Sequence, residues 1–303
     1  MSACCSPGAG ARGPAPAVTT AVHTTSLTDW SPDAGLRLLP LRGGSFAMGS
    51  EDADAVPGDG EGPVREVRVE PYAIDAHCVS NQRFEAFVNA TGHITDAERY
   101  GWSFVFEGFL PARLRDSERA AEAPWWAAVP GATWRAPEGP GSDLEGRHDH
   151  PAVHVSWNDA LAYCRWAGVR LATEAEWEYA ARGGLRRARY AWGDDLLPEG
   201  RHACNIWQGS FPATNTLEDG WFGTAPVDAF EPNGFGLFNV AGNVWEWTAD
   251  PWSVADAIDP GARVIRGGSY LCHASYCNRY RVSARTSSTP DSSTGHQGFR
   301  VAL

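Results

Sequence analysis

The sequence predicts a single large α+β domain with little regular secondary structure, and three observations support this. The 303 residues include 33 glycines and 21 prolines, which interrupt helices and strands, so short elements and long ordered loops are expected. Fourteen tryptophans indicate a core built from large aromatic side chains. The chain contains short strand patterns and short capped helices, with no evident internal repeat. We expect this domain over residues 31–303, preceded by a disordered lead over residues 1–30.

The charge balance disfavours several classes of partner. Lysine and arginine total 25 against 37 acidic residues, a net charge of −12, which argues against nucleic acid and anionic membranes and suits a basic peptide. No run of 18 or more apolar residues is present, so no transmembrane helix is expected. The N-terminal lead lacks the basic start and apolar run of a secretory signal, so we expect a cytoplasmic protein, and a monomer.

Four short segments open the predicted domain. Residues 36–41 and 44–50 are predicted to be strands joined by a glycine turn. The acidic, glycine-rich residues 51–62 predict a solvated loop. Residues 64–69 interleave charged with apolar side chains, which is typical of a strand.

The first helix pattern begins after Ser80, whose hydroxyl can cap it. Phe84, Phe87 and Val88 fall on one face at the i, i+3, i+4 spacing, and Gly92 ends the pattern.

Two further helices are predicted from capping boxes, in which a side chain at each end of the first turn bonds the backbone of the other. Ser156 with Asp159 opens one of these helices. Thr173 with Glu176 opens the next, over residues 175–182, and a glycine ends each pattern.

Residues 100–150 show no clear period but are rich in aromatic side chains. They predict either a buried, irregular wall or the lining of a groove, and packing is expected for most of them. These aromatics are Trp102, Phe104, Phe106, Phe109, Trp125, Trp126 and Trp134.

Residues 190–250 have the composition of a long loop, rich in asparagine, aspartate, glycine and tryptophan. Asn205, Asp219, Asn239 and Glu246 carry the hard oxygen donors that calcium binds. Residue types alone favour the simpler explanation, in which asparagine and aspartate cap their own turns.

Three strands are predicted near the C-terminus, over residues 264–266, 279–285 and 298–303. Between the first two lie Cys272 and Cys277. Five extended residues span roughly 17 Å, whereas a disulfide needs about 5.5–6 Å between Cα atoms, so only a loop that folds back can join the two sulfurs.

The cysteine pair has three possible roles: a structural disulfide, a redox-active dithiol, or a soft-metal site. Zinc is disfavoured because no further cysteine or histidine stands at zinc-site spacing. Two thiolates alone suit Cu(I), because thiolate ligands select for that ion. Residue types alone favour the disulfide or the dithiol. Elsewhere, Cys164 lies in the apolar face of a predicted helix and is expected to be a buried small hydrophobe.

Six motifs resemble the formylglycine-generating enzyme family, also called the sulfatase-modifying factor family. They lie at residues 44–49 (GSFAMG), 150–157 (HPAVHVSW), 170–180 (RLATEAEWEYA), 242–247 (GNVWEW), 266–269 (RGGS) and 298–300 (GFR). The cysteine pair and residues 205–209 and 215–230 are similar to the formylglycine-generating branch itself. The resemblance implies a large, irregular variant of the C-type-lectin-like fold.

The resemblance also implies an activity. Members of this branch use O2 to convert the cysteine of a Cys-x-Pro-x-Arg sequence, in an unfolded type I sulfatase chain, to Cα-formylglycine. Because the two loop cysteines of the family hold Cu(I), Cys272 and Cys277 are the expected copper ligands. The oxygen pocket of the family corresponds to Trp245, Ser269 and Tyr276.

The resemblance also implies two structural calcium sites, which would hold in place the loops beside the copper. The first set is Asn205, Ile206, Asp219 and Trp221. The second set is Asn239, Gly242, Val244 and Glu246.

Two other functions are weighed against the copper oxidase. A catalytically silent module that binds sulfatases or other extended peptides would need no thiols, so the cysteine pair disfavours it. An iron-dependent sulfoxide synthase would need an additional histidine-bearing domain, and the chain has no room for one.

Overall fold

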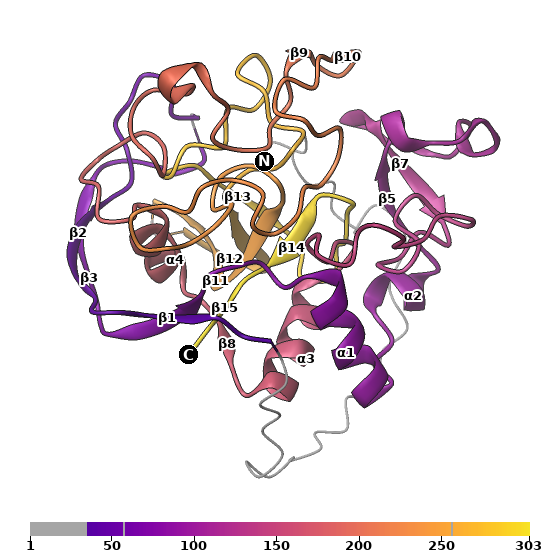
Figure 1. The fold of residues 1–303 in the computed structure, drawn as a ribbon, viewed down its shortest axis with the longest axis horizontal. Coiled ribbons are helices and arrows are strands. Elements are labelled where there is room, and N and C mark those ends of the chain that lie inside the picture. The colour runs from indigo at the N-terminus through magenta and orange to yellow at the C-terminus, as the bar shows by residue number, and fades with distance from the viewer. Residues whose placement is uncertain (1–34, 57, 256) are drawn as a thin grey trace.

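The computed structural model describes residues 35–303 except 57 and 256 (Figure 1). The lead predicted over residues 1–30 lies outside these described residues. The helices are α1 (Asn81–Thr91), α2 (Asp96–Tyr100), α3 (Trp157–Ala167) and α4 (Glu174–Ala181), with single 3-10 turns at Glu107–Phe109, Ala112–Leu114 and Pro198–Gly200. No helix within the described part of the chain has the length and apolar character needed to cross a membrane.

The strands are short except for two. The N-terminal half holds β1 (Leu38–Leu41), β2 (Gly44–Met48), β3 (Arg65–Val69), β4 (Tyr72–Asp75), β5 (Trp102–Phe106), β6 (Arg119–Ala120) and β7 (Ala123–Pro130). The C-terminal half holds β8 (Arg170–Leu171), β9 (Gly209–Ser210), β10 (Thr214–Asn215), β11 (Trp245–Val254), β12 (Ala257–Arg266), β13 (Arg285–Ser288), β14 (Gln297–Phe299) and β15 (Val301–Ala302). The predicted α+β class with little regular structure is confirmed.

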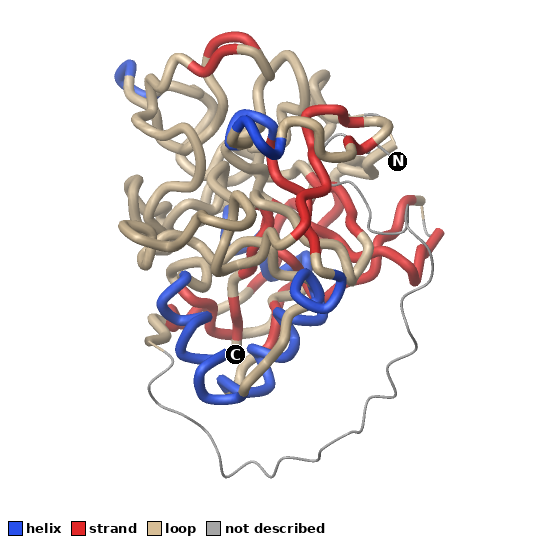
Figure 2. The backbone as a smooth tube through the Cα atoms, turned by 90° about the vertical axis from the view of Figure 1, so that its right-hand side faces the viewer, coloured by secondary structure: helices blue, strands red, loops and turns tan. Residues whose placement is uncertain are grey.

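The sheets are small and separate. The central one has the order β13-β12-β11-β14, in which β11 is antiparallel to β12 and parallel to β14. A second has the order β1-β4-β15-β8, a third β5-β7-β6, and β2 with β3 and β9 with β10 form two-stranded ribbons. Most of the α-helices gather at the end of the molecule near the C-terminus, whereas loops make up much of the opposite end (Figure 2).

The predicted helix starts are confirmed. The Ser80 hydroxyl accepts a hydrogen bond from the Arg83 amide, and Gly92 ends α1 in the left-handed conformation at φ 67°. Both capping boxes form, one at Ser156 before α3 and one at Thr173 before α4. Capping groups lie within one turn of the bonds they complete, so local sequence is sufficient to place these helices.

The core is aromatic, as predicted. Phe84 and Phe87 of α1 pack against Tyr163 of α3. The same buried cluster extends to Trp245 and Trp247 of β11. It includes the two cysteines of the C-terminal loop, so this loop is part of the core.

Two predicted segments are corrected by the structure. Residues 279–284 form turns, and the strand begins only at Arg285, because all residues from 279 to 285 are buried without the alternation of a strand. The acidic loop, residues 51–62, is only partly solvated: Asp59 and Glu61 are 6% and 3% exposed and pair with Arg279 and Arg281. The pairing of these two segments explains both differences.

Two other elements were not predicted. Residues 100–150 contain the sheet of β5, β6 and β7, in which Trp102–Phe106 pairs antiparallel with Trp126–Pro130. The stretch taken as a loop to residue 250 ends in β11. Continuous apolar runs such as these carry no clear period, so burial on both faces concealed the strands.

Candidate active site around two buried cysteines

The loop that carries the cysteines begins at the end of β12. Arg266, the last residue of this strand, is fully buried and donates to Glu174 at 2.8 Å and to Glu178 at 2.5 Å, both on α4. Gly268 follows at φ 73°, where an added Cβ would lie 2.8–3.0 Å from the backbone of Arg279 and Tyr280. Only glycine fits this close approach, by which the loop folds back on itself.

Cys272 and Cys277 are both buried, at 2% and 5% exposed, and neither is in a disulfide in the structure. The Cys272 amide donates to the Ser269 carbonyl at 2.9 Å, and the Ser269 amide lies 3.4 Å from the Cys272 sulfur. The Cys277 amide donates to the His273 carbonyl at 3.0 Å. The backbone therefore forms two tight turns that bring both thiols to one cavity.

The cavity is very small, about 10 Å³, and its walls are mostly aromatic. It brings Trp245, Ser269 and Tyr276 together with both cysteines, so the residues expected from the resemblance meet at one place. The full lining is Trp125, Trp126, Trp245, Ser269, Leu271, Cys272, Tyr276, Cys277 and His296.

Two indole groups in the lining are unsatisfied. The Nε1–H groups of Trp126 and Trp245 are buried and have no hydrogen-bond acceptor among the described residues. Buried donors in native proteins nearly always have a partner, so these two groups fit an acceptor placed in the cavity. Oxygen is the natural acceptor for an indole N–H.

His296 and Trp126 were not identified from the sequence as parts of this site. Their rings lie 4.5 Å apart, and His296 Nδ1 lies 2.6 Å from the Thr294 hydroxyl. No local pattern marks His296. Trp125 and Trp126 belong to residues 100–150, which were predicted to be either a buried wall or the lining of a groove. These two side chains do line the cavity.

Tyr276 is held at the rim by two aromatic neighbours. Its ring stacks on Phe211 at 4.4 Å and meets Trp125 edge-on at 4.8 Å. Beneath the loop, burial raises the pKa of the Tyr280 phenol, and the neighbouring Tyr190, Cys204, Cys272 and Cys277 add to the effect. The phenol of Tyr280 is therefore neutral beside the thiols.

The first predicted calcium set comes together in space. The Asp219 carboxylate accepts from the Ile206 amide at 2.9 Å and from the Trp221 amide at 3.0 Å. The Asn205 Oδ1 atom is buried with no donor among the described residues. Gln208, which the sequence analysis did not select, donates its side-chain amide to Asp219 and to the Ile206 carbonyl. Several oxygen atoms and one orphaned amide oxygen fit a hard cation.

In the second predicted calcium set, one residue has an unsatisfied oxygen that fits a metal ion. Asn239 Oδ1 is buried and unpartnered among the described residues. The Glu246 carboxylate, by contrast, accepts from Arg300, Trp177 and Cys78. Within the described chain, no cluster of three or more His, Cys, Asp or Glu side chains is placed to hold a metal. Both calcium sites stay predictions.

Comparisons with known proteins identify the family of the chain. Residues 33–303 match the family described as sulfatase-modifying factor enzyme 1-like domain. A formylglycine-generating enzyme of Thermomonospora curvata is 62% identical over 280 residues, which is 88% of this chain and 92% of the relative. A Bos taurus protein named inactive C-alpha-formylglycine-generating enzyme 2 is 47% identical over 272 residues, which is 88% of both chains.

A solved structure shares the architecture. PvdO from Pseudomonas aeruginosa is 27% identical and superposes with a TM-score of 0.60, covering 88% of this chain and 93% of that one. The family match spans the described fold and the whole cysteine loop. The chain therefore belongs to the sulfatase-modifying factor family, the family of the formylglycine-generating enzymes.

Proposed function

We propose that this protein is a copper-dependent oxidase that uses O2 to convert the cysteine of a Cys-x-Pro-x-Arg sequence in type I sulfatases to Cα-formylglycine, which activates the sulfatase. One observation carries the proposal. Cys272 and Cys277, two buried thiols, line one small cavity together with Trp245, Ser269 and Tyr276.

The donor set of the cavity suits Cu(I). Both cysteines lie outside any disulfide, and thiolate sulfur is the ligand that Cu(I) prefers. Cys272 and Cys277 would hold the ion. When bound, it would bind the substrate thiolate and supply electrons for O2.

The surrounding residues would exclude water and stabilise reduced oxygen. Trp125, Trp126 and Trp245 form apolar walls. The indole N–H groups of Trp126 and Trp245 have no acceptor among the described residues. Ser269, whose hydroxyl accepts from the Leu271 amide at 3.3 Å, has its own proton to donate. Preorganised donors in a dry cavity stabilise developing negative charge on oxygen.

The chemistry on the substrate needs few protein groups. Loss of one hydrogen from the thiol sulfur and one from Cβ gives a thioaldehyde, and these two electrons and two protons, with two more of each from a thiol reductant, reduce O2 to water. Water then replaces the sulfur to give the aldehyde and hydrogen sulfide. The protein therefore has to position Cβ beside the oxidant, which binding of the substrate next to the two thiols in one small cavity provides.

Calcium would have a structural role. Asn205, Ile206, Asp219 and Trp221 would hold one ion, supported by the orphaned Asn205 oxygen. Asn239 supports a second site, with Gly242, Val244 and Glu246 as the other members of the predicted set. Location in the cytoplasm and a monomeric state also stay predictions.

The test is direct. The copper-loaded protein is mixed in air, with a thiol reductant, with a peptide that contains Cys-x-Pro-x-Arg, and the aldehyde is detected by mass spectrometry and hydrazine trapping. Cys272→Ala and Cys277→Ala should give no aldehyde. Cys164→Ala is the matched control, because Cys164 is also buried but lies on α3, outside the cavity, so this variant should retain activity. An unchanged peptide with the wild-type protein would overturn the proposal.

A binding module without catalysis is the alternative, but relatives named formylglycine-generating enzyme, at 62% and 53% identity, are more similar to this chain than the relative named inactive, at 47%. It predicts that the peptide binds with equal affinity to the wild type and to Cys272→Ala, and that neither protein converts it.

A further inference from the structure

A buried ion pair is linked to the residue that follows the second cysteine. Glu61 in the acidic loop and Arg281 in the C-terminal segment lie 220 residues apart, and both side chains are about 1% exposed. The two terminal nitrogens of Arg281 donate to the two Glu61 oxygens at 2.6 and 2.7 Å. This is the bidentate geometry that makes arginine–carboxylate pairs strong and directional.

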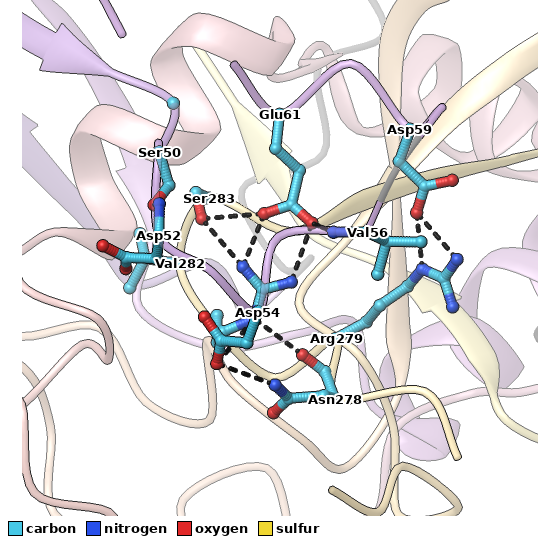
Figure 3. A network of polar contacts seen from close by, with 12 residues as sticks. Ser50, Asp52, Asp54, Val56, Asp59, Glu61, Asn278, Arg279, Val282 and Ser283 are labelled. Atoms are coloured by element: carbon cyan, nitrogen blue, oxygen red, sulfur yellow. Dashed lines mark hydrogen bonds and ion pairs between the residues drawn. The ribbon is translucent and has the colours of Figure 1, made fainter. Parts of the chain in front are cut away.

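The third nitrogen of Arg281 connects the pair to the cysteine loop. Its Nε donates to the Asn278 carbonyl at 2.9 Å. Asn278 directly follows Cys277 and adopts the left-handed conformation at φ 46°, which asparagine tolerates. The Asn278 side chain donates to Asp54 at 2.9 Å (Figure 3). The acidic loop therefore holds both the backbone and the side chain of the residue after Cys277.

The other side of Cys277 is also anchored. The amides of Tyr276, Cys277 and Asn278 lie 3.0, 3.0 and 3.1 Å from one acceptor, the His273 carbonyl. Cys277 is thus held between this turn and the Arg281 anchor. Cys272 belongs to the preceding turn and has no contact of this kind with the acidic loop in the described structure.

Glu61 is fully engaged. Besides Arg281, it accepts from the Val56 amide at 2.9 Å and the Ser283 hydroxyl at 3.0 Å (Figure 3). Arg279 forms a parallel pair with Asp59, at 2.8 Å from Nε. Buried ion pairs add little net stability compared with apolar packing, because both charges lose water, but they select one geometry.

We propose that the Glu61–Arg281 pair is a positioning element for the copper site. It sets the place of the Cys277 sulfur relative to Cys272, so that the two thiols are arranged for one ion before that ion binds. This inference rests on the proposed copper function. Neither residue lines the cavity, so both act through the backbone at Asn278.

The experiment measures Cu(I) affinity, by competition with a chromogenic Cu(I) chelator under anaerobic conditions. Glu61→Gln keeps the shape of the side chain but removes the charge, and Arg281→Lys removes the donor to Asn278. Both should weaken Cu(I) binding by about 10- to 100-fold, the usual effect of losing a partner that orients a metal ligand. The copper K-edge spectrum of each variant should also depart from that of the wild type.

The matched control is Asp75→Asn. Asp75 is also fully buried and pairs with Arg83 at 2.7 Å, but this pair joins β4 to α1, outside the cysteine loop. The control should lose thermal stability while keeping wild-type Cu(I) affinity. Should Glu61→Gln not fold, Arg281→Lys and Asp54→Asn give the same comparison.

The outcomes separate the two proposals. Tight Cu(I) binding by the wild type, with equal affinity in folded Glu61→Gln and Arg281→Lys, overturns the positioning role and leaves the copper oxidase intact. If Asp75→Asn also loses Cu(I) affinity, the losses reflect general stability, and the positioning role is again overturned. Absence of Cu(I) binding by the wild type overturns the proposed function, and the positioning role with it.

Discussion

The guanidinium of Arg300 donates to both carboxylate oxygens of Glu246, at 3.1 and 2.9 Å, and both side chains are about 1% exposed. The other donors to this carboxylate are the Trp177 indole at 2.7 Å and the Cys78 thiol at 3.0 Å. Burial, with the charge of Glu246 as the next cause, raises the pKa of the Cys78 thiol, so this sulfur keeps its proton and can donate it. The carboxylate has a complete set of donors from the protein itself.

This pairing predicts that Glu246 stabilises the fold whether or not calcium is bound. Glu246→Ala should lower the free energy of unfolding by about 3–5 kcal/mol, because Arg300 would be left as an unpaired buried charge. Urea unfolding in calcium and in EGTA checks this. Equal losses in both conditions are expected from the ion pair alone, and a larger loss in calcium would show that Glu246 also holds the second calcium ion.

Calcium should stabilise the protein through the first set of ligands. At a calcium concentration near 100 times Kd, the wild type should gain about 2.7 kcal/mol of stability over its EGTA form. Asp219→Asn should remove most of this gain, because Asp219 supplies the carboxylate of the four-residue set, and charged oxygen ligands bind calcium most strongly. Thermal unfolding at increasing calcium concentrations measures this gain in stability.

The exposed loop residue Glu218 gives the control, as Glu218→Gln removes an acidic group next to Asp219 along the chain. This variant should keep the full calcium-dependent gain. If calcium leaves the melting temperature of the wild type unchanged, both predicted calcium sites are wrong.

The indole of Trp245 should assist turnover. Trp245→Phe keeps the apolar wall but removes an N–H with no acceptor in the described structure, so kcat for the peptide should fall by up to about 100-fold. Aldehyde formation under saturating peptide measures this.

Trp134→Phe is a suitable comparison. The Trp134 indole N–H is likewise buried and unpartnered among the described residues, but it packs on Phe84 of α1 rather than in the cavity. This variant should keep kcat. Equal effects of the two substitutions would show that the Trp245 N–H has no special role in the reaction.

His154 makes stability depend on pH. Burial lowers its pKa to about 4, from an ordinary value of about 6.5. Between these values the unfolded chain binds a proton that the folded chain does not, so stability falls as pH drops from about 6.5 to 4, by about 3 kcal/mol in total. Asn is the suitable substitution, because His154 has φ 57°, a conformation that asparagine tolerates.

His154→Asn should therefore lose less stability than the wild type between pH 7 and pH 4.5. Urea unfolding at several pH values measures the difference. His148→Asn, at an exposed histidine, should follow the wild-type curve. Parallel curves for the wild type and His154→Asn would contradict the assignment.

The sequence was sufficient for features that depend on neighbouring residues. Ser80, Ser156 and Thr173 cap their helices as predicted, since each hydroxyl bonds an amide three residues ahead. The cysteine loop could be selected because Cys272 and Cys277 are close in sequence and lie in a motif of the family.

Only the tertiary structure decided which distant segments meet. Trp126 and His296 line the cavity together although 170 residues separate them, and Glu61 is buried against Arg281 although its loop looks solvated in sequence. Charged and aromatic side chains have no fixed local partner, because their place depends on which buried groups need a hydrogen bond or a countercharge. That demand arises only once the chain has packed, so the architecture, the thiol pair and its neighbours Trp245, Ser269 and Tyr276 were predictable, whereas His296 and the Glu61–Arg281 pair were not.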